Sequence, residues 1–469
     1  MGGNHEREEI KMKRKLAVLL TGAMVMATLA GCGGGDAAPA AETAAPAAAE
    51  EAPAAEEAPA AEEEAPAAEE EAPAEDGAAA AEGATDYSGV ELTFWSMWSA
   101  GEPQAVVIEE AAKAFSEKTG AKINIEWKGR DINTIIQTAL ESGEKIDIFE
   151  DDYSRISKIY KDFCYDLTDM AAAAGYDAQS YKCFNDVATG WAGFLPCVTE
   201  QPQVGGIFYN KDIFDDCGIT PPATWEEFLA ACQTMVDKGY QPLALDSAYA
   251  DFTFGYHLDR YLGEAAISEL ATNGGWSENE SVAKAAQDII DFVKAGYLAE
   301  GAPEEYPSSQ NKIGLTGKVA MIVCANYVCA EVNNNSGTEV NWSMFNYPSV
   351  EGGADASNSY AGANSLAVTS YSENPQAAFD FLMFLTSGEF DQKMADSASQ
   401  IPADPRNTAP AIMNGTVETL QATSNPLSWN MGLNDNADLK ASFKDLIIQL
   451  YEGKFATGED FAAAMDALY

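Results

Sequence analysis

The stretch that decides the fold class is Val90-Glu91-Leu92-Thr93-Phe94-Trp95, in which apolar and polar side chains alternate as in a half-buried strand. Apolar residues at helical spacing follow over Pro103–Lys118. A second strand is expected over Ala121–Trp127, a second helix over Asp131–Leu140 and a third strand over Ile146–Phe149. This order and spacing predict an α/β protein that has a parallel sheet with helices on both faces.

The later part of the chain follows the same order of elements. Strands are expected over Gly205–Tyr209, Val319–Val323 and Leu366–Thr369. Thr224–Glu227 has the sequence of a capping box, so a helix is predicted to begin there. Pro375 stands at a favoured first-turn position of a helix that is predicted to reach Thr386.

Composition limits the functions that this chain can have. It has 469 residues, with 27 Lys and Arg against 74 Asp and Glu, a net charge of −47. Such a polyanion repels nucleic acid and anionic lipid headgroups, so no nucleic-acid partner is expected. His5 and His257 are the only two histidines, which argues against His-based metal sites and most catalytic triads. We therefore predict no metal and no cofactor.

The N-terminal segment has the pattern of an export signal. Basic residues precede the apolar run Leu16–Met26, and Leu29-Ala30-Gly31-Cys32 follows. This tetrapeptide resembles the lipobox of bacterial lipoproteins, which implies a signal peptide over 1–31 and lipidation of Cys32. An uncleaved anchor and an ordinary signal peptide are the alternatives, and either Met1 or Met12 could be the start.

Residues 32–86 consist almost entirely of Ala, Glu, Pro and Gly in a recurring E-E-A-P-A-A pattern. A segment of this composition cannot bury enough apolar surface to fold, so we expect a disordered linker. The linker would tether the rest of the chain to the outer face of the cytoplasmic membrane. In a cell with an outer membrane that is the periplasmic side, and the sequence leaves the cell type open.

Seven cysteines other than Cys32 lie in the remaining chain, and no two of them form a C-x-x-C motif. A large exported chain with an odd number of cysteines does not resemble a disulfide framework. Buried thiols are favoured, and a redox role is the alternative. The seven are Cys164, Cys183, Cys197, Cys217, Cys232, Cys324 and Cys329.

Several motifs together resemble one known family, the extracellular solute-binding proteins of bacterial ABC importers, in the carbohydrate-binding branch that includes maltodextrin-binding protein. The most specific motif is Ile207–Asp212 followed by Pro221–Phe228. The resemblance spans residues 88–469. Its other motifs are Phe94-Trp95 with Trp98, Ala114–Gly120, Ile123–Trp127, Gly317–Met321 and Asn374–Leu382.

The resemblance implies a periplasmic-binding-protein-like fold, in which a multi-strand hinge joins two α/β lobes and the ligand binds in the cleft between them. About four hundred residues beyond the linker suit two lobes. Lobe one would comprise 87–199 and 347–400, and lobe two 203–345 and 402–469. The crossings would fall near Cys197–Gln203, Phe345–Pro348 and Ile401–Pro402.

A sugar site needs aromatic planes for stacking and polar side chains for its hydroxyl groups. In lobe one we expect Trp98 in the cleft and Trp95 in the core, because their parity in the strand differs. Glu102 and Arg130 lie on the next loops, with a solvated surface as the alternative. Asp152 ends the third strand, and we favour a ligand contact over a helix-capping role there.

The remaining candidates rest on the resemblance. Tyr327 stands where many relatives carry a stacking tryptophan, and Trp429 aligns with a late aromatic of the cleft. Trp276, in a Gly-rich loop, is a weaker candidate for capping the cleft. The complete set for this half is Gln203, Asp246, Tyr249, Phe252, Trp276, Asn326, Tyr327, Asn364 and Trp429.

The resemblance implies a monomeric solute-binding component that delivers a sugar or oligosaccharide to ABC permease subunits, and no enzyme activity. An exported glycoside hydrolase is the first alternative, and it needs two carboxylates roughly 5–9 Å apart across one bond. Asp151 and Asp152 are neighbours in a predicted strand, so they point to opposite faces. A carbohydrate-binding adhesion or sensing module is the second alternative.

Overall fold

The structure, a computed structural model, describes residues 85–469. The predicted signal peptide, the lipidation site Cys32 and nearly all of the predicted linker lie outside the described residues. Within the described part, no helix combines the length and the apolar composition that crossing a membrane requires.

The first sheet begins with three parallel strands, as the sequence predicts. Strand β1 (Glu91–Ser96) lies between β2 (Lys122–Trp127) and β3 (Ile148–Asp152), and both neighbours run parallel to it. Later strands add an antiparallel part to this sheet. Strand β8 (Ala361–Val368) pairs antiparallel with β3 and with β4 (Val198–Asn210), so the sheet is mixed.

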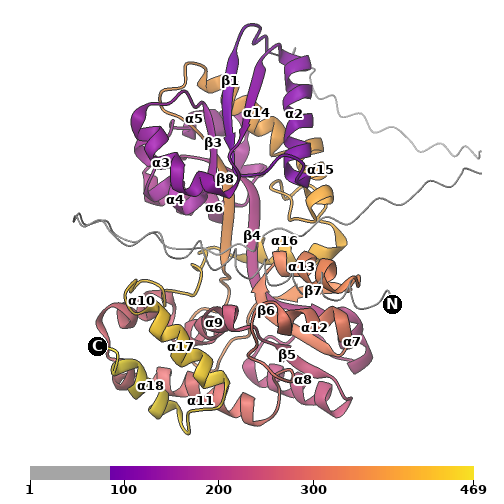
Figure 1. The fold of residues 1–469 in the computed structure, drawn as a ribbon, viewed down its shortest axis with the longest axis vertical. Coiled ribbons are helices and arrows are strands. Elements are labelled where there is room, and N and C mark those ends of the chain that lie inside the picture. The colour runs from indigo at the N-terminus through magenta and orange to yellow at the C-terminus, as the bar shows by residue number, and fades with distance from the viewer. Residues whose placement is uncertain (1–84) are drawn as a thin grey trace, which may run out of the picture. The chain divides into compact units, whose positions relative to one another are not determined.

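Helices cover both faces of this sheet (Figure 1). Apolar residues of α2, α14 and α15 pack on one face, and those of α3, α4 and α6 pack on the other. The helices of this part are α2 (Pro103–Thr119), α3 (Ile132–Ser142), α4 (Tyr153–Lys158), α5 (Thr168–Ala174), α6 (Lys182–Ala192), α14 (Pro375–Leu385) and α15 (Gly388–Ala398), with the 3-10 turn η1 (Gly129–Asp131).

The second half of β4 belongs to another set of strands. It pairs antiparallel with β6 (Val319–Ala325) and with β7 (Trp342–Phe345), and β5 (Gln241–Ala244) runs parallel to β6. The helices of this part are α7 (Lys211–Cys217), α8 (Trp225–Asp237), α9 (Ala250–Leu262), α10 (Glu264–Asn273), α11 (Glu280–Lys294), α12 (Ser308–Thr316), α13 (Tyr327–Ser336), α16 (Thr416–Ala422), α17 (Lys440–Tyr451) and α18 (Gly458–Asp466).

Strand β4 therefore joins the two sets of strands, and Figure 1 shows it running from one into the other. Two glycines lie where its partners change. A Cβ atom at Gly205 would lie 2.9 Å from the Phe252 ring, and one at Gly206 would lie 2.8 Å from the Phe345 carbonyl oxygen. Only glycine fits this close approach, so the sequence of β4 permits the packing of α9 and β7 against the junction.

The predicted capping box at α8 is confirmed. The Thr224 hydroxyl accepts a hydrogen bond from the Glu227 amide at 3.2 Å, and the Glu227 carboxylate accepts one from the Thr224 amide at 3.3 Å. The capping box fixes the residue at which α8 begins, and the start of the helix determines which side chains face the core.

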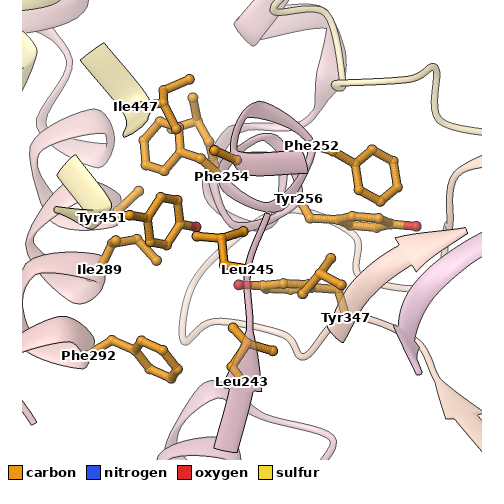
Figure 2. Packing of buried hydrophobic residues seen from close by; sticks show 14 of the residues in the cluster. Leu243, Leu245, Phe252, Phe254, Tyr256, Ile289, Phe292, Tyr347, Ile447 and Tyr451 are labelled. Atoms are coloured by element: carbon orange, nitrogen blue, oxygen red, sulfur yellow. The ribbon is translucent and has the colours of Figure 1, made fainter. Parts of the chain in front are cut away.

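Helix α9 runs through the interior of the second part, where Ala250–Arg260 are buried on every side of the helix. Figure 2 shows Phe254 and Tyr256 of α9 among side chains from α11, α17 and β5. The Tyr256 and Tyr347 rings stack with centroids 5.4 Å apart and planes only 7° from parallel. This contact links α9 to the segment that leaves β7.

The seven cysteines of the described part are free, and six of them are buried. This is the state that the buried-thiol interpretation predicts. Burial raises the pKa of the Cys197 thiol to about 12, so this thiol is protonated and unreactive at neutral pH.

Candidate functional site

Three predicted site residues meet at the end of β1. The Arg130 guanidinium donates to both carboxylate oxygens of Glu102, at 3.0 and 3.1 Å, and to the Met97 carbonyl oxygen at 2.6 Å. Its Cζ atom lies 4.4 Å from the centre of the Trp98 ring. Trp98 is only 6 % exposed, so it lies beneath Arg130 instead of facing open solvent. We name Trp98, Glu102 and Arg130 the lobe-one cluster.

A row of polar side chains crosses the sheet next to this cluster. Asp152 of β3 pairs with Asn364 of β8, and Asn364 pairs with Gln201 of β4. Asp152 Oδ1 accepts hydrogen bonds from the Ser154 amide at 2.9 Å and the Arg155 amide at 3.3 Å, so Asp152 is the N-cap of α4. Asp152 thus has the capping role that the sequence offered as the alternative, and a ligand contact by Asp152 stays a prediction.

An aromatic cluster lies beyond the row. The half-buried Trp429 stacks on Phe252 with ring centroids 4.1 Å apart, and it meets the edges of Tyr360 at 5.2 Å and Tyr249 at 6.3 Å. The Tyr360 hydroxyl donates to Gln203 Oε1 at 3.4 Å. We name Tyr249, Phe252, Tyr360 and Trp429 the aromatic cluster, and it brings the predicted residues Tyr249, Phe252, Gln203 and Trp429 together.

Tyr327 opens α13 and lies at the side of this cluster. Its hydroxyl group interacts with that of Tyr249 and with the Cys324 thiol, and burial raises the pKa of both tyrosines. The aromatic side chain is thus neutral and in contact with Tyr249. A role in stacking stays a prediction.

Three other candidates serve the protein interior. Trp276 has no exposed surface, and its ring packs 5.6 Å from that of Phe443 in α17. Asp246 is fully buried and accepts hydrogen bonds from the Ser309 and Gln310 amides at the start of α12. Asn326 Oδ1 accepts from the Val204 amide at 3.0 Å and ties β6 to β4. We leave Trp276, Asp246 and Asn326 out of the site.

Aromatic residues that the sequence did not single out complete the region. The Tyr153 hydroxyl donates to the Ala361 carbonyl oxygen at 3.3 Å, and its ring lies 5.5 Å from that of Trp191. Trp191 is 36 % exposed. Tyr360 belongs to the aromatic cluster. The sequence offered one signal for each of these residues. Tyr153 directly follows the candidate Asp152, and Tyr360 stands just before Gly362-Ala363-Asn364.

A groove of about 550 Å³ lies elsewhere, beside β7 and the 3-10 turn η6 (Ala411–Met413). No predicted site residue is among its lining residues, which are Lys211, Asn341, Trp342, 407–411, 413–415, Val417 and Glu418. Residues 85–469 hold no group of three or more His, Cys, Asp or Glu side chains that could bind a metal ion.

These residues are suited to binding a solute that has both apolar faces and hydroxyl groups. In the aromatic cluster, the half-buried Tyr360 and Trp429 offer ring surface, whereas Phe252 and Tyr249 are buried behind them. Gln203, Asn364 and the lobe-one cluster offer donors and acceptors. The two carboxylates at the β3 end of the polar row, Asp151 and Asp152, already have partners. Asp152 caps α4, and Asp151, 2 % exposed, lies 3.4 Å from Arg155.

Comparisons with known proteins agree with this assignment. The model of a family described as "Bacterial extracellular solute-binding protein" matches residues 99–392. The melibiose/raffinose/stachyose-binding protein MelE of Bacillus subtilis (strain 168) is 22 % identical over 193 residues, which cover 40 % of this chain and 44 % of that protein. The chain spans about half the length of the curated relatives it matches.

Solved structures establish the fold. The bacterial solute receptor AcbH, described with a preference for β-D-galactopyranose, has a TM-score of 0.66 at 17 % identity and covers 81 % of this chain and 98 % of its own. A cyclo/maltodextrin-binding protein in complex with maltotetraose has a TM-score of 0.61 at 16 % identity, with coverages of 83 % and 97 %. The two sets of strands joined by β4 thus form the two-lobed fold of these receptors.

Proposed function

Because the chain belongs to the bacterial extracellular solute-binding proteins, we propose that it captures a sugar or oligosaccharide and delivers it to the permease of an ABC importer. The observation that carries this proposal is the aromatic cluster around Trp429, half-buried and next to the polar side chains of Gln203 and Asn364. Relatives whose names specify melibiose, raffinose and stachyose or galactooligosaccharides support the sugar.

We further propose that the solute lies between the lobe-one cluster and the aromatic cluster. Lobe one would comprise 87–199 and 347–400, and lobe two 203–345 and 402–469. Strand β4 runs through the proposed junction at 198–203, and β8 is its partner there. Rotation about these crossing segments would close the two clusters around a solute.

The proposal includes a lipid anchor at Cys32 and a flexible linker up to residue 86, outside the described residues. A tether of this kind would hold a monomeric receptor at high effective concentration next to its permease. The relatives named above are receptors, which favours a binding protein over an exported glycoside hydrolase.

A binding screen tests the proposed function. The full chain is expected to gain thermal stability from at least one neutral oligosaccharide, because a solute that binds only the folded state stabilises it by about 2.7 kcal/mol at a hundredfold excess over Kd. The screen would include raffinose, stachyose, maltotetraose and galactose, with sodium sulfate as an ionic-strength control. A flat response to all sugars, together with a shift from amino acids or phosphate esters, would contradict the sugar assignment.

A further inference from the structure

Two buried glutamates face each other across β8. Leu366 of β8 pairs with Glu150 of β3 on one side and with Val198 of β4 on the other. Glu200 lies two residues after Val198, where the register of β4 shifts. Glu150 has no exposed surface and Glu200 is 2 % exposed. The carboxyl groups of Glu150 and Glu200 interact with each other.

The surrounding donors satisfy only one of the four carboxyl oxygens. Glu150 Oε2 accepts hydrogen bonds from the Ser96 hydroxyl at 2.9 Å and from the Met97 amide at 3.2 Å. Among residues 85–469, Glu150 Oε1 and both oxygens of Glu200 find no donor while both groups are ionised. A proton on one carboxyl group would provide the missing hydrogen bond, as in carboxyl pairs that share a site.

The charges around the pair favour this proton. Arg130 is the nearest cation, and it is already engaged with Glu102, while Asp391 of α15 adds negative charge beside Glu200. Burial and then the Glu150 charge raise the pKa of Glu200, and burial raises the pKa of Glu150. In the described part, no third ligand is placed to make this pair a metal site.

The pair also supports the loop that carries Trp98. The Met97 amide donates to Glu150, and the Trp98 amide donates to the Ser96 hydroxyl, which itself donates to Glu150. The Trp98 side chain lies next to Glu200, although its Nε1 atom has no hydrogen-bond partner in the described part. The Trp98 backbone is thus linked to Glu150 through Ser96, and its ring lies under the Arg130 guanidinium.

We propose that Glu150 and Glu200 share one proton as a carboxylic acid–carboxylate pair, and that this pair positions Trp98. The importance of this glutamate pair for solute affinity rests on the proposed function. The shared proton and the position of Trp98 do not depend on that function. Loss of the proton would place two negative charges side by side in the interior and displace the loop that bears Trp98.

Infrared spectroscopy of the ligand-free full chain tests the shared proton directly. With ¹³C-labelled glutamate carboxyl groups, we expect the carbonyl band of a protonated glutamic acid at pH 7, and we expect Glu200→Gln to lose its intensity. Glu109→Gln, an exposed carboxylate on α2, is the matched control and should leave the band unchanged. An identical band in the wild type and in Glu200→Gln would overturn the shared proton.

Unfolding at different pH values provides a second readout. A native pKa raised above the unfolded value means that the folded chain holds the extra proton between these two values, so stability falls as the pH rises through that window. Relative to Glu200→Gln, the unfolding constant of the wild type should therefore increase by up to about tenfold per pH unit between pH 5 and pH 8. Equal slopes in the two proteins would contradict the proposal.

Fluorescence tests the positioning of Trp98 without any solute. The contribution of Trp98, obtained by subtracting the emission of Trp98→Phe, should change between pH 6 and pH 9 in the wild type. The Trp98 emission should stay constant with pH in Glu200→Gln, because the amide keeps a donor and an acceptor. In Glu200→Ala the Trp98 emission should differ from that of the wild type at every pH. If the Trp98 emission had the same pH profile in Glu200→Gln and in the wild type, the proposal that the glutamate pair positions Trp98 would be rejected. Failure of raffinose binding would count against the proposed function alone.

Discussion

Replacement of Arg260 by methionine is expected to lower the free energy of unfolding by about 3–5 kcal/mol, because it leaves the buried Asp259 charge without a partner. Arg260 has no exposed surface, and its Nη1 donates to Asp259 Oδ2 at 2.7 Å. Burial raises the pKa of Asp259 to about 6 even with Arg260 present. Without Arg260 the variant should lose least stability near pH 5, where Asp259 can take up a proton.

The same side chain fixes the segment between β7 and β8. Its Nε donates to the Tyr347 carbonyl oxygen at 3.1 Å, and its Nη2 donates to Asn346 Oδ1 and to the Asn358 carbonyl oxygen, both at 3.0 Å. This segment includes one of the proposed crossings between the lobes. Loss of Arg260 should therefore disturb the proposed hinge as well as the interior around α9.

Urea unfolding at pH 7 measures the effect of Arg260→Met. Lys182→Met is the matched control, since Lys182 is 78 % exposed and pairs with an exposed Asp186, so we expect almost no change in the free energy of unfolding. Adding Asp259→Asn to Arg260→Met should restore part of the lost stability. A single Arg260→Met variant as stable as Lys182→Met would show that the buried pair contributes little.

The elements with local signals were predictable from the sequence. The helix expected over 103–118 is α2, and the strands expected near 90–95 and 121–127 are β1 and β2. Each of these depends on alternation or helical spacing within a few residues, and α2 ends at Gly120 with a φ of 80°. Such signals do not depend on the rest of the chain.

The antiparallel strands were not predictable in the same way. The first half of β4, Val198–Gln203, contains Pro202 and lacks a clear alternation, so local patterns predict a strand only from Gly205. The crossing near Cys197–Gln203 was expected from the family resemblance alone. The pairing of β4 with β8 joins segments that are far apart in the sequence. No local pattern specifies which strand enters a sheet from the opposite direction, and the mixed sheet follows from that pairing.

The candidate site was also predictable only where the signals are local. The family motifs located the loops, but burial by distant helices decided which side chains remained available. Trp276 and Trp429 are both tryptophans next to turn-forming residues, yet α17 and α18 enclose only Trp276. The Glu150–Glu200 pair was equally hidden, because it depends on β8, a strand from far along the chain, lying between β3 and β4.

These two tryptophans allow loss of binding to be separated from loss of folding. Trp429→Ala is expected to weaken the affinity for the oligosaccharide found in the screen by about 1–3 kcal/mol, roughly 5- to 150-fold in Kd, because it removes a stacking face at the proposed site. Its ring is half-buried on Phe252, so stability should fall by less than for a fully buried tryptophan.

Trp276→Ala is the matched control, and it should give the opposite result. Its ring is fully buried against Phe443, so we expect a loss of about 3–5 kcal/mol in the free energy of unfolding. Wherever this variant is still folded, its Kd should equal that of the wild type. Titration calorimetry at a temperature at which both variants are folded measures the two affinities. If Trp429→Ala bound the oligosaccharide with the same Kd as the wild type, the Trp429 ring would not contact the solute. The aromatic cluster would then not be part of the binding site.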